Sequence, residues 1–355
     1  MINIIVFVLN TALVAALFVS YAAVYVNPDL FYIPAFFGLA YPFIMVANVI
    51  MMLWWVAQLH LKFLMSLFAL LSGWSFIGRT ITYHSQATPD STALCVMSYN
   101  VMNFGFEKNA NLRDDILKLV SDEQPDILCL QEYCNNKTWK IQLERTFAEA
   151  INAEQYFFHN VVADKNTAFQ AGTLIISKYP ILGTGEVPYD TPSGNSTIYA
   201  DIDVKGTTVR VFNVHLQSIR FQNKDYRFLR EFTDDKDKAI EESKSILARM
   251  RQAFVMRAAQ AQKIREAVKA SPHKVILCGD FNDSPVSYAY QQISHNLKDA
   301  FEEKGRGLGR SYIGEFPRFR IDYIMCSENF TVQSFEVVHK KLSDHYPVKA
   351  HIVVK

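Results

Sequence analysis

An acid and an amide, Asp280 and Asn282, follow directly on an apolar, β-branched run, Lys274–Cys278. The run predicts a buried strand. Because side chains two residues apart at a strand end point to the same side, the sequence places one carboxylate and one amide together at the edge of a sheet. The turn Asp283-Ser284-Pro285 comes next and can cap a helix from about Val286. Loops at such an edge can bring further polar groups to this pair.

Other acids, amides and histidines lie in the same kind of position, at or just past an apolar strand or in the loop that leads to the next one. They are Asn100, Glu132, Asn213, His215, Asp322, Asp344 and His345. One such residue alone is usually a turn former or a helix cap. The recurrence of the pattern favours a single site, because residues at one edge of a sheet can converge.

The chemistry of this set is that of a hard cation and a phosphate. Carboxylates and amides without cysteine or clustered histidine are ligands for Mg²⁺ or Mn²⁺, which prefer phosphate oxygens and keep room for water. Hydrolysis also needs an activated water and a charged partner for the developing negative charge. His345 is the candidate partner, with one of Asp344 and Asp322 on the metal and the other orienting the imidazole.

The charge distribution divides the 355 residues into two unlike parts, although the formal net charge is +1 and half of the residues are hydrophobic. From Met1 to Gly78 the only charged side chains are Asp29 and Lys62. The remaining part is long enough for one large domain and has no basic excess of the kind expected in a protein that grips long nucleic acid. The five cysteines show no metal-binding spacing, which indicates free buried thiols.

The first 78 residues are predicted to form three transmembrane helices, because each of three apolar stretches approaches the length that crosses a bilayer. The stretches are Ile2–Val26, Leu30–Leu59 and Phe63–Gly78. A cleaved signal peptide is the alternative for the first stretch, but it lacks a basic leading region and further apolar stretches follow it. A lipid bilayer is therefore an expected partner, whereas the sequence points to no protein partner.

The orientation of these helices rests on a few charges near the predicted turns. His60 and Lys62 lie in the second turn and favour a cytoplasmic location for it, whereas Arg79 favours the opposite. Three spans place the two chain ends on opposite sides of the membrane. We therefore expect a multi-pass membrane protein whose catalytic domain is extracytoplasmic.

The domain organisation predicted from the chain is a membrane region over residues 1–78, a polar linker over 79–92 and one α/β domain over 93–355. The predicted helices are Asn111–Gln124, Thr138–Ile151 and Asp234–Ala270. The predicted strands are Ala93–Tyr99, Ile127–Leu130, Gly172–Ser177, Thr197–Val204, Thr207–Leu216, Lys274–Cys278, Ile321–Cys326 and Val348–Val353. The apolar residues of the longest helix recur every seven positions, so one stripe of it is expected to pack on the body.

Seven short motifs occur in an order that resembles the endonuclease/exonuclease/phosphatase family. They are Met97-Ser-Tyr-Asn100-Val101, Gln131-Glu132, Ser177-Lys178-Tyr179-Pro180, Asn213-Val214-His215-Leu216, Gly279-Asp280-Phe281-Asn282, Arg320-Ile321-Asp322-Tyr323-Ile324 and Ser343-Asp344-His345-Tyr346-Pro347. Each motif alone is weak, but all seven in sequence over residues 97–347 are specific. The resemblance implies a four-layered α/β sandwich, two mixed sheets flanked by helices, and metal-dependent hydrolysis of a phosphoester by in-line attack of water.

The resemblance also implies roles for the metal-binding residues. Glu132 would be the main metal ligand, with Asn100 beside it and Asp344 near the metal or its water. The sequence departs from the pattern at Met102, where many nucleases of the family carry an acid. That departure argues against a second metal position and against abasic-site nuclease activity.

The remaining site residues are assigned to the water and the phosphate by the same resemblance. Asp280 would orient or deprotonate the attacking water, and Asn282 would contact the phosphate. His345, paired to Asp322, would face the phosphate, and His215 would contact one of its oxygens.

Two further residues are predicted to bind substrate. Asn213 would support His215, and Arg220 opens a basic and aromatic loop that could bind a nucleic-acid strand, dock on anionic headgroups or simply be solvated.

The substrate is not fixed by the catalytic set, which the family's nucleases, sphingomyelinases and phosphatases share. The membrane helices and the near-neutral domain favour a lipid headgroup or small phosphodiester over nucleic acid. The alternatives are a Mg²⁺-dependent endonuclease and an inert binding module on the same fold. An inert module would be expected to have lost one of the acids or His345, and none is missing.

Overall fold

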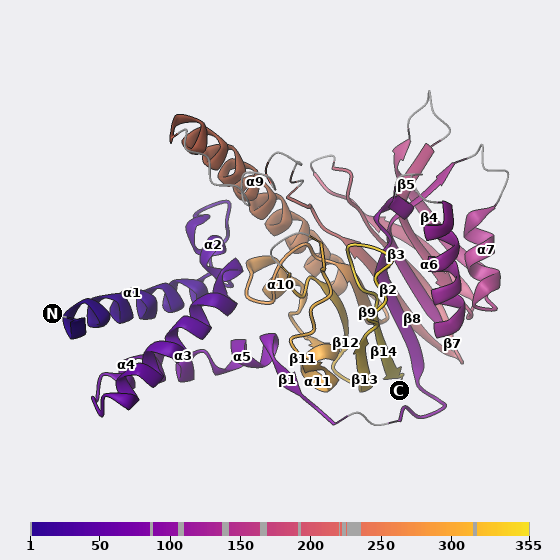
Figure 1. The fold of residues 1–355 in the computed structure, drawn as a ribbon. Coiled ribbons are helices and arrows are strands. Elements are labelled where there is room, and N and C mark those ends of the chain that lie inside the picture. The colour runs from indigo at the N-terminus through magenta and orange to yellow at the C-terminus, as the bar shows by residue number, and fades with distance from the viewer. Residues whose placement is uncertain are drawn as a thin grey trace. The chain divides into compact units, whose positions relative to one another are not determined.

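The structure is a computed structural model that describes residues 2–85, 88–105, 110–136, 142–163, 169–190, 193–219, 221, 225, 236–314 and 318–354. It divides into two compact units (Figure 1). One unit comprises residues 1–81, 219–259 and 283–292, and the other comprises residues 82–218, 260–282 and 293–355. The second unit carries the sheets and the candidate site.

The first six-stranded sheet has the order β13-β14-β2-β3-β5-β4. Its strands are β2 (Leu94–Asn100), β3 (Ile127–Asn136), β4 (Gln155–Ala163), β5 (Phe169–Ser177), β13 (Thr331–Val337) and β14 (Val348–Val353). Strands β2 and β3 run parallel, and the other neighbours are antiparallel. Two helices, α6 (Ala110–Glu123) and α7 (Leu143–Ala150), follow β2 and β3 along the chain.

The second six-stranded sheet has the order β10-β12-β9-β8-β7-β6. Its strands are β6 (Ile181–Val187), β7 (Thr197–Val204), β8 (Thr207–His215), β9 (Lys274–Asp280), β10 (Leu297–Asp299) and β12 (Asp322–Ser327). Here β8 and β9 are the parallel pair. The smaller elements of the unit are η1 (Met102–Gly105), α11 (Ala300–Lys304) and a pairing of β1 (Thr82–Tyr83) with β11 (Arg306–Gly307).

The alternation of side chains along each strand explains the layers. In β2, Leu94 and Val96 lie in the core between the two sheets, whereas Met97 and Tyr99 lie in a separate core with residues of α6 and α7. Because both faces are covered, all seven residues of β2 are buried. Helix α9 (Lys236–Lys269) precedes β9 along the chain, and its residues Ala261 and Ile264 are fully buried. The prediction of an α/β fold with mixed sheets flanked by helices is confirmed.

The unit that holds the N-terminus is built on apolar helices. They are α1 (Ile2–Ala22), α2 (Ile33–Leu39), α3 (Tyr41–Ala57), α4 (Phe63–Ser72) and α5 (Trp74–Thr80). Only α1 is by itself long and apolar enough to cross a membrane among the described helices. The second and third predicted spans are each broken into two helices bent by 69°, so up to three spans exist if each bent pair counts as one. A proline near the start of α2 and of α3 explains part of this, since proline cannot supply the N–H of a continuous helix.

Two distant segments complete this unit, which the linear division of the sequence does not anticipate. They are residues 219–259, which include the first part of α9, and residues 283–292, which include most of α10 (Tyr288–Ile293). The aromatic ring of Phe36 in α2 meets that of Phe254 in α9 edge-on, with centroids 5.1 Å apart. Arg79 of α5 donates to the side chain of Gln291 at 2.8 Å.

Candidate active site

The ends of four strands bring the candidate residues together. In the parallel pair of β8 and β9, His215 lies beside Asp280, and in the antiparallel pair of β9 and β12, Asp322 lies on the other side of Asp280. In the other sheet, Asn100 at the end of β2 pairs with Gln131, the neighbour of Glu132. Gly279 permits the close approach of β8, because a Cβ there would lie 1.9 Å from the carbonyl oxygen of Val214 and its φ is +143°.

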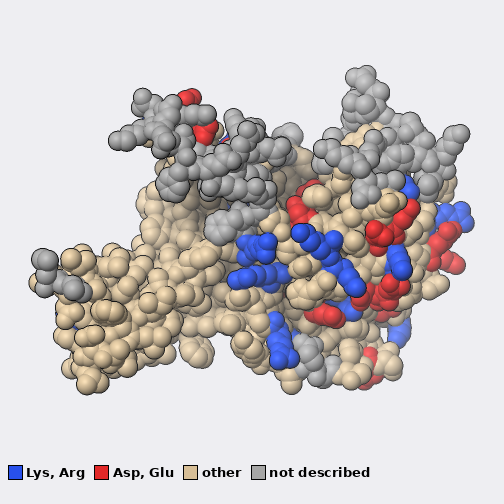
Figure 2. Space-filling model, viewed as in Figure 1, with Lys and Arg blue, Asp and Glu red and all other residues tan. Residues whose placement is uncertain are grey.

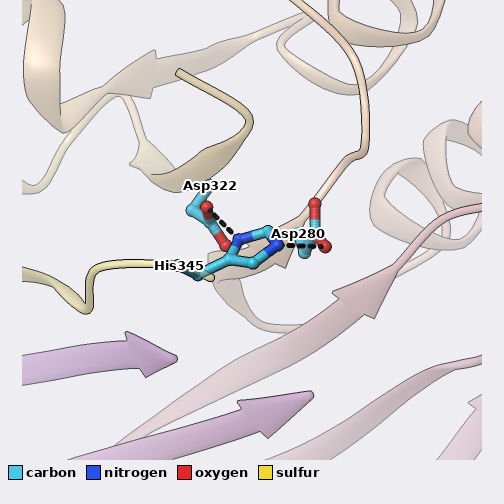
Figure 3. A group of neighbouring side chains, drawn as sticks. All are labelled: Asp280, Asp322 and His345. Carbon is cyan, nitrogen blue, oxygen red and sulfur yellow. Dashed lines mark hydrogen bonds and ion pairs between the residues drawn. The ribbon is translucent and has the colours of Figure 1, made fainter. Parts of the chain in front are cut away.

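Asp280, Asp322 and His345 form the buried centre of the site (Figure 3). The Nδ1 atom of His345 lies 2.8 Å from Oδ2 of Asp322, and its Nε2 atom lies 3.8 Å from Oδ2 of Asp280. The two acids are 1% exposed and the histidine 4%. The imidazole is therefore held between two carboxylates with almost no access to solvent.

The protonation of this trio follows from its burial and charges. Burial raises the pKa of Asp280 to about 6, and the charge of His345 limits that rise. Burial alone would lower the pKa of His345, but Asp322 and Asp280 outweigh it and raise the pKa to about 10. At neutral pH the site thus holds an ionised Asp280 and a positively charged His345, which suits a base beside a partner for negative charge.

A second polar group surrounds Glu132. The amide nitrogen of Asn100 donates to Oε1 of Glu132 at 3.2 Å and to Oδ2 of Asp280 at 3.0 Å, and the amide of Asn103 donates to Oε2 of Glu132 at 3.2 Å. The Nε2 atom of His215 lies 3.6 Å from Oε1 of Glu132. Asn100 therefore links the two carboxylates, one from each sheet.

A local distortion of β3 aims Glu132 into this group. The register of β3 shifts between Leu130 and Tyr133, and Glu132 adopts a φ of +47°. A non-glycine residue in that conformation is strained, and such strain together with a β-bulge is common where a strand re-aims a functional side chain.

The oxygen-rich donors fit a divalent cation of the Mg²⁺ class. Two carboxylates share the one amide of Asn100, and Oδ1 of Asp322 is buried without a hydrogen-bond partner among the described residues. Asp280, Asp322 and His345 are also close enough to hold an ion. A proton on His345 would compete with that ion, so Glu132 and Asn100 are the better candidates to hold it. When bound, such an ion polarises a phosphoryl oxygen and makes a bound water more acidic.

Asp344 and Asn282 lie at the edges of these groups. Asp344 is half-buried beside His345, and the hydroxyl of Ser343 donates to the carbonyl oxygen of Asn100 at 2.9 Å, which ties this loop to the end of β2. Asn282 donates to Oδ2 of Asp280 at 3.1 Å from its side chain and to Oδ1 at 2.8 Å from its backbone. In this structure Asn282 orients the carboxylate of Asp280.

The structure places Asn213, a predicted substrate-binding residue, in the interior between the two sheets. Asn213 is fully buried, accepts from Gln131 at 2.7 Å and donates to the carbonyl oxygens of Leu130 and Leu174, each at 3.0 Å. It joins the two sheets through these contacts, and its part in substrate binding stays a prediction. Arg220, the other predicted substrate-binding residue, lies outside the described residues.

Three residues that sequence reasoning missed also contribute. Asn103 contacts Glu132 as described above, and the side-chain nitrogen of Asn195 lies 3.0 Å from Nε2 of His215 and donates to the carbonyl of Leu216 at 2.8 Å. The ring of Tyr312 meets His345 with centroids 5.1 Å apart. All three lie outside the strands, Asn103 in the short helix η1 and the other two in loops. The spacing of Asn103 three residues after Asn100 was the only signal available.

Comparison with known proteins agrees with this site. Residues 97–345 match the Endonuclease/Exonuclease/phosphatase family, whose members are typically hydrolases of phosphoesters and generally depend on a divalent metal. Residues 3–80 match a separate domain family of unknown function. No curated protein shows significant sequence similarity to the chain.

Several solved structures share the fold. An endonuclease/exonuclease/phosphatase from Bacteroides vulgatus is 18% identical, with a TM-score of 0.54 over 75% of this chain and 100% of that chain. The human Nocturnin catalytic domain is 16% identical, with a TM-score of 0.53 over 75% and 96%. Humanized D. rerio TDP2 is 15% identical, with a TM-score of 0.52 over 74% and 99%. At these identities the likeness concerns the fold alone.

Proposed function

Because the chain belongs to the endonuclease/exonuclease/phosphatase family, we propose that it is a membrane-anchored, metal-dependent phosphoesterase that hydrolyses a phosphodiester by in-line attack of an activated water. One observation carries the proposal. The buried His345, charged and held by Asp322, faces Asp280, and Asn100 links Asp280 to Glu132. One group of side chains thereby contains a base in Asp280, a cation in His345 and a metal-binding carboxylate in Glu132.

Each side chain has a part in this proposed reaction. Asp280, ionised above about pH 6 and oriented by Asn282, accepts the proton of the attacking water. His345 keeps its positive charge through the pairing with Asp322 and stabilises charge that develops on the phosphoryl oxygens. His215, held by Asn195, contacts another of these oxygens. Glu132 and Asn100 would hold the metal ion, and Asp344 would assist them.

The membrane anchor is the second part of the proposal. Helix α1 is long and apolar enough to cross a bilayer, and so is each of the two bent helix pairs when the pair is taken as one span. We propose three passes with the catalytic unit on the extracytoplasmic side, for the reasons of charge given above. Exposed apolar side chains along these helices, such as Ile5, Ile50 and Phe68, support contact with lipid.

A lipid headgroup or small phosphodiester is the substrate that we propose. The net charge of +1 gives no broad basic face for a duplex. Arg310, Arg318, Lys340 and Lys341 are exposed and form no ion pair with another described residue.

These four cations belong to loops beside His345. Tyr312 and His345 form a β-bridge, and the amide of Ile313 donates to the carbonyl of Asp344 at 2.7 Å. Figure 2 shows lysine and arginine side chains on the face in view, with aspartate and glutamate side chains among and beside them. A local group of this size suits a single anionic headgroup.

The test is hydrolysis of bis-p-nitrophenyl phosphate by the full-length chain in detergent, with Mg²⁺ and with a chelator. We expect turnover only with the ion and a loss of at least about 100-fold in kcat for Glu132→Ala and for His345→Ala. Turnover that is independent of metal and of both residues would refute the proposal and leave the inert binding module.

The substrate class needs a second comparison. The full-length chain in liposomes is offered plasmid DNA, RNA, sphingomyelin-type lipids and phosphoinositides under the same Mg²⁺ concentration. We expect the lipid phosphodiesters to be hydrolysed fastest. Faster cleavage of nucleic acid would replace the substrate proposal by the endonuclease alternative while leaving the catalytic assignment intact.

A further inference from the structure

The segment that follows the loop from Asp280 to Asp283, here called the catalytic loop, is part of the core of the N-terminal helices. Val286, six residues after Asp280, is 1% exposed and belongs to one apolar cluster with Leu17, Tyr41 and Phe76. Residues 283–292 as a whole fall in the same compact unit as residues 1–81. The chain therefore passes from Asn282 directly into the packing of the apolar helices.

Gly38 in α2 is the point of closest approach. A Cβ at Gly38 would lie 2.3 Å from the carbonyl oxygen of Val286 and 2.6 Å from the Cβ of Ala23. The hydroxyl of Ser284 lies 3.4 Å from the carbonyl oxygen of Gly38, to which it donates. Because the blocking atom at 2.3 Å belongs to the backbone and cannot rotate away as a side chain could, any larger residue at position 38 must shift the backbone of α2 or of the 284–286 segment.

A buried ion pair fixes Asp283, the last residue of the catalytic loop. Nε of Arg257 lies 2.9 Å from Oδ2 of Asp283, and the two side chains are 1% and 6% exposed. The other carboxylate oxygen of Asp283 accepts from the backbone nitrogen of Ser284 at 2.9 Å. The same helix carries Phe254, which packs against Phe36 of α2. Asp283 is thus held by the unit to which the N-terminal helices belong.

We infer that the N-terminal helical region, which matches a family of unknown function, positions the catalytic loop in addition to anchoring the chain. The loop from Asp280 to Asp283 is short, and Asn282 adopts a φ of +52° while it bonds both oxygens of Asp280. A displacement of Asp283 is transmitted through one peptide bond to Asn282. Gly38 and Ser284 are positioning residues in this inference, which rests on the proposed function for its effect on turnover.

The test compares Gly38→Val with Gly78→Val in the full-length chain. Gly78 is the matched control, because it lies in the same helical region and a Cβ there meets nothing within 4 Å. Two quantities are measured: kcat for bis-p-nitrophenyl phosphate, and hydrogen–deuterium exchange of the amides of residues 281–284. The exchange measurement needs no turnover, so it remains informative if the proposed activity fails.

For Gly38→Val we expect kcat to fall by about 10- to 100-fold, since small misplacements of catalytic groups have effects of that size. KM should stay within about twofold, and exchange should accelerate at residues 281–284 while the amides of Val275–Cys278 in β9 keep the wild-type rate. Gly78→Val should match the wild type in both measurements.

Two results would overturn the inference: equal behaviour of the two variants, or an exchange increase in Gly38→Val that is as large in β9 as in the loop. If Gly38→Val does not accumulate as folded protein, Ser284→Ala tests the inference instead. This variant removes the hydroxyl that donates to the carbonyl oxygen of Gly38, and it adds no volume. Faster exchange at residues 281–284 in Ser284→Ala supports the inference, and wild-type exchange there refutes it.

Discussion

His345 and Asp322 join the two sheets of the sandwich through a hydrogen bond of 2.8 Å between Nδ1 and Oδ2. Asp322 is the first residue of β12 in one sheet, and His345 lies in the loop that leads to β14 in the other. The pairing fixes the orientation of the imidazole and, together with the charge of Asp280, maintains its positive charge.

Replacing the carboxylate of Asp322 by an amide tests this pairing directly. Asp322→Asn preserves the shape of the side chain but removes the largest of the charges that raise the pKa of His345. We expect kcat to fall by about 100-fold or more, a loss typical of a displaced acid–base group. The pKa of His345, measured by NMR of the labelled imidazole, should fall in the variant. An unchanged pKa would show that Asp322 does not control the histidine.

The pH dependence of the reaction follows from the two shifted pKa values. Asp280 must be ionised to accept a proton, so activity should be lost as pH falls through about 6. His345 must be protonated to stabilise negative charge, so activity should be lost as pH rises through about 10. The profile of kcat/KM against pH should therefore be bell-shaped with a broad plateau. Activity that rises through pH 10 would contradict the role given to His345.

Glu132 is predicted to set the affinity for the metal ion. Glu132→Gln keeps the size of the side chain and one of its two contacts with amide donors, but it removes a charged ligand. The Mg²⁺ concentration for half-maximal activity should rise by about 10- to 100-fold. Asp203→Asn is the matched control, because Asp203 is an acid in β7 near the Lys205-Gly206 turn, at the opposite end of that hairpin from His215. Equal Mg²⁺ dependence in the two variants would remove Glu132 from the metal site.

The close contact at Gly279 predicts a folding defect. In Gly279→Ala the Cβ would overlap the carbonyl oxygen of Val214, and alanine would be forced to a φ of +143°. We expect a loss of about 3 kcal/mol or more in the free energy of unfolding, or no folded protein. Gly183→Ala in β6 should change it by less than about 1 kcal/mol, because its nearest contact is 3.6 Å away. Similar stabilities would show that the strands can separate without cost.

The cations beside His345 are predicted to recognise an anionic headgroup. Lys341→Gln should raise KM for vesicles of an anionic phospholipid by about fivefold, since one lysine near such a surface contributes about 1 kcal/mol. KM for bis-p-nitrophenyl phosphate should change less. Lys205→Gln, in the β7–β8 turn, should leave both values unchanged. A uniform effect on both substrates would argue that Lys341 acts on the fold rather than on the headgroup.

Strands with strong apolar patterns were predictable, and weakly patterned ones were not. The prediction of β14 is confirmed residue for residue at Val348–Val353, and that of β7 at Thr197–Val204. Strand β6 was missed because Gly183 and Gly185 interrupt it and it lies at the edge of its sheet. Strand β13 was missed as well. Its sequence is half polar, and it becomes a strand through pairing with β14.

The polar residues at strand ends were predictable, but their neighbours depended on tertiary structure. Asp280 and Asp322 were expected at one edge, and their register as direct partners agrees with that expectation. The burial of Asn213 was not predictable, because the sequence does not say which strand end lies behind the site. Asn195 approaches His215 only through the folding of a loop. The bend between α4 and α5 likewise had no signal in composition, whereas Pro42 marked the bend between α2 and α3.

The central claim is that a metal held by Glu132 lies within reach of His345 in one pocket. Manganese added to the full-length chain with labelled histidines tests this most directly, because the ion broadens the NMR signals of nearby nuclei. We predict broadening of His345 and His215, an unaffected signal for His273 at the opposite end of β9, and loss of the broadening in Glu132→Ala. Equal broadening of all histidines, or broadening of His345 that persists in Glu132→Ala, would contradict the claim.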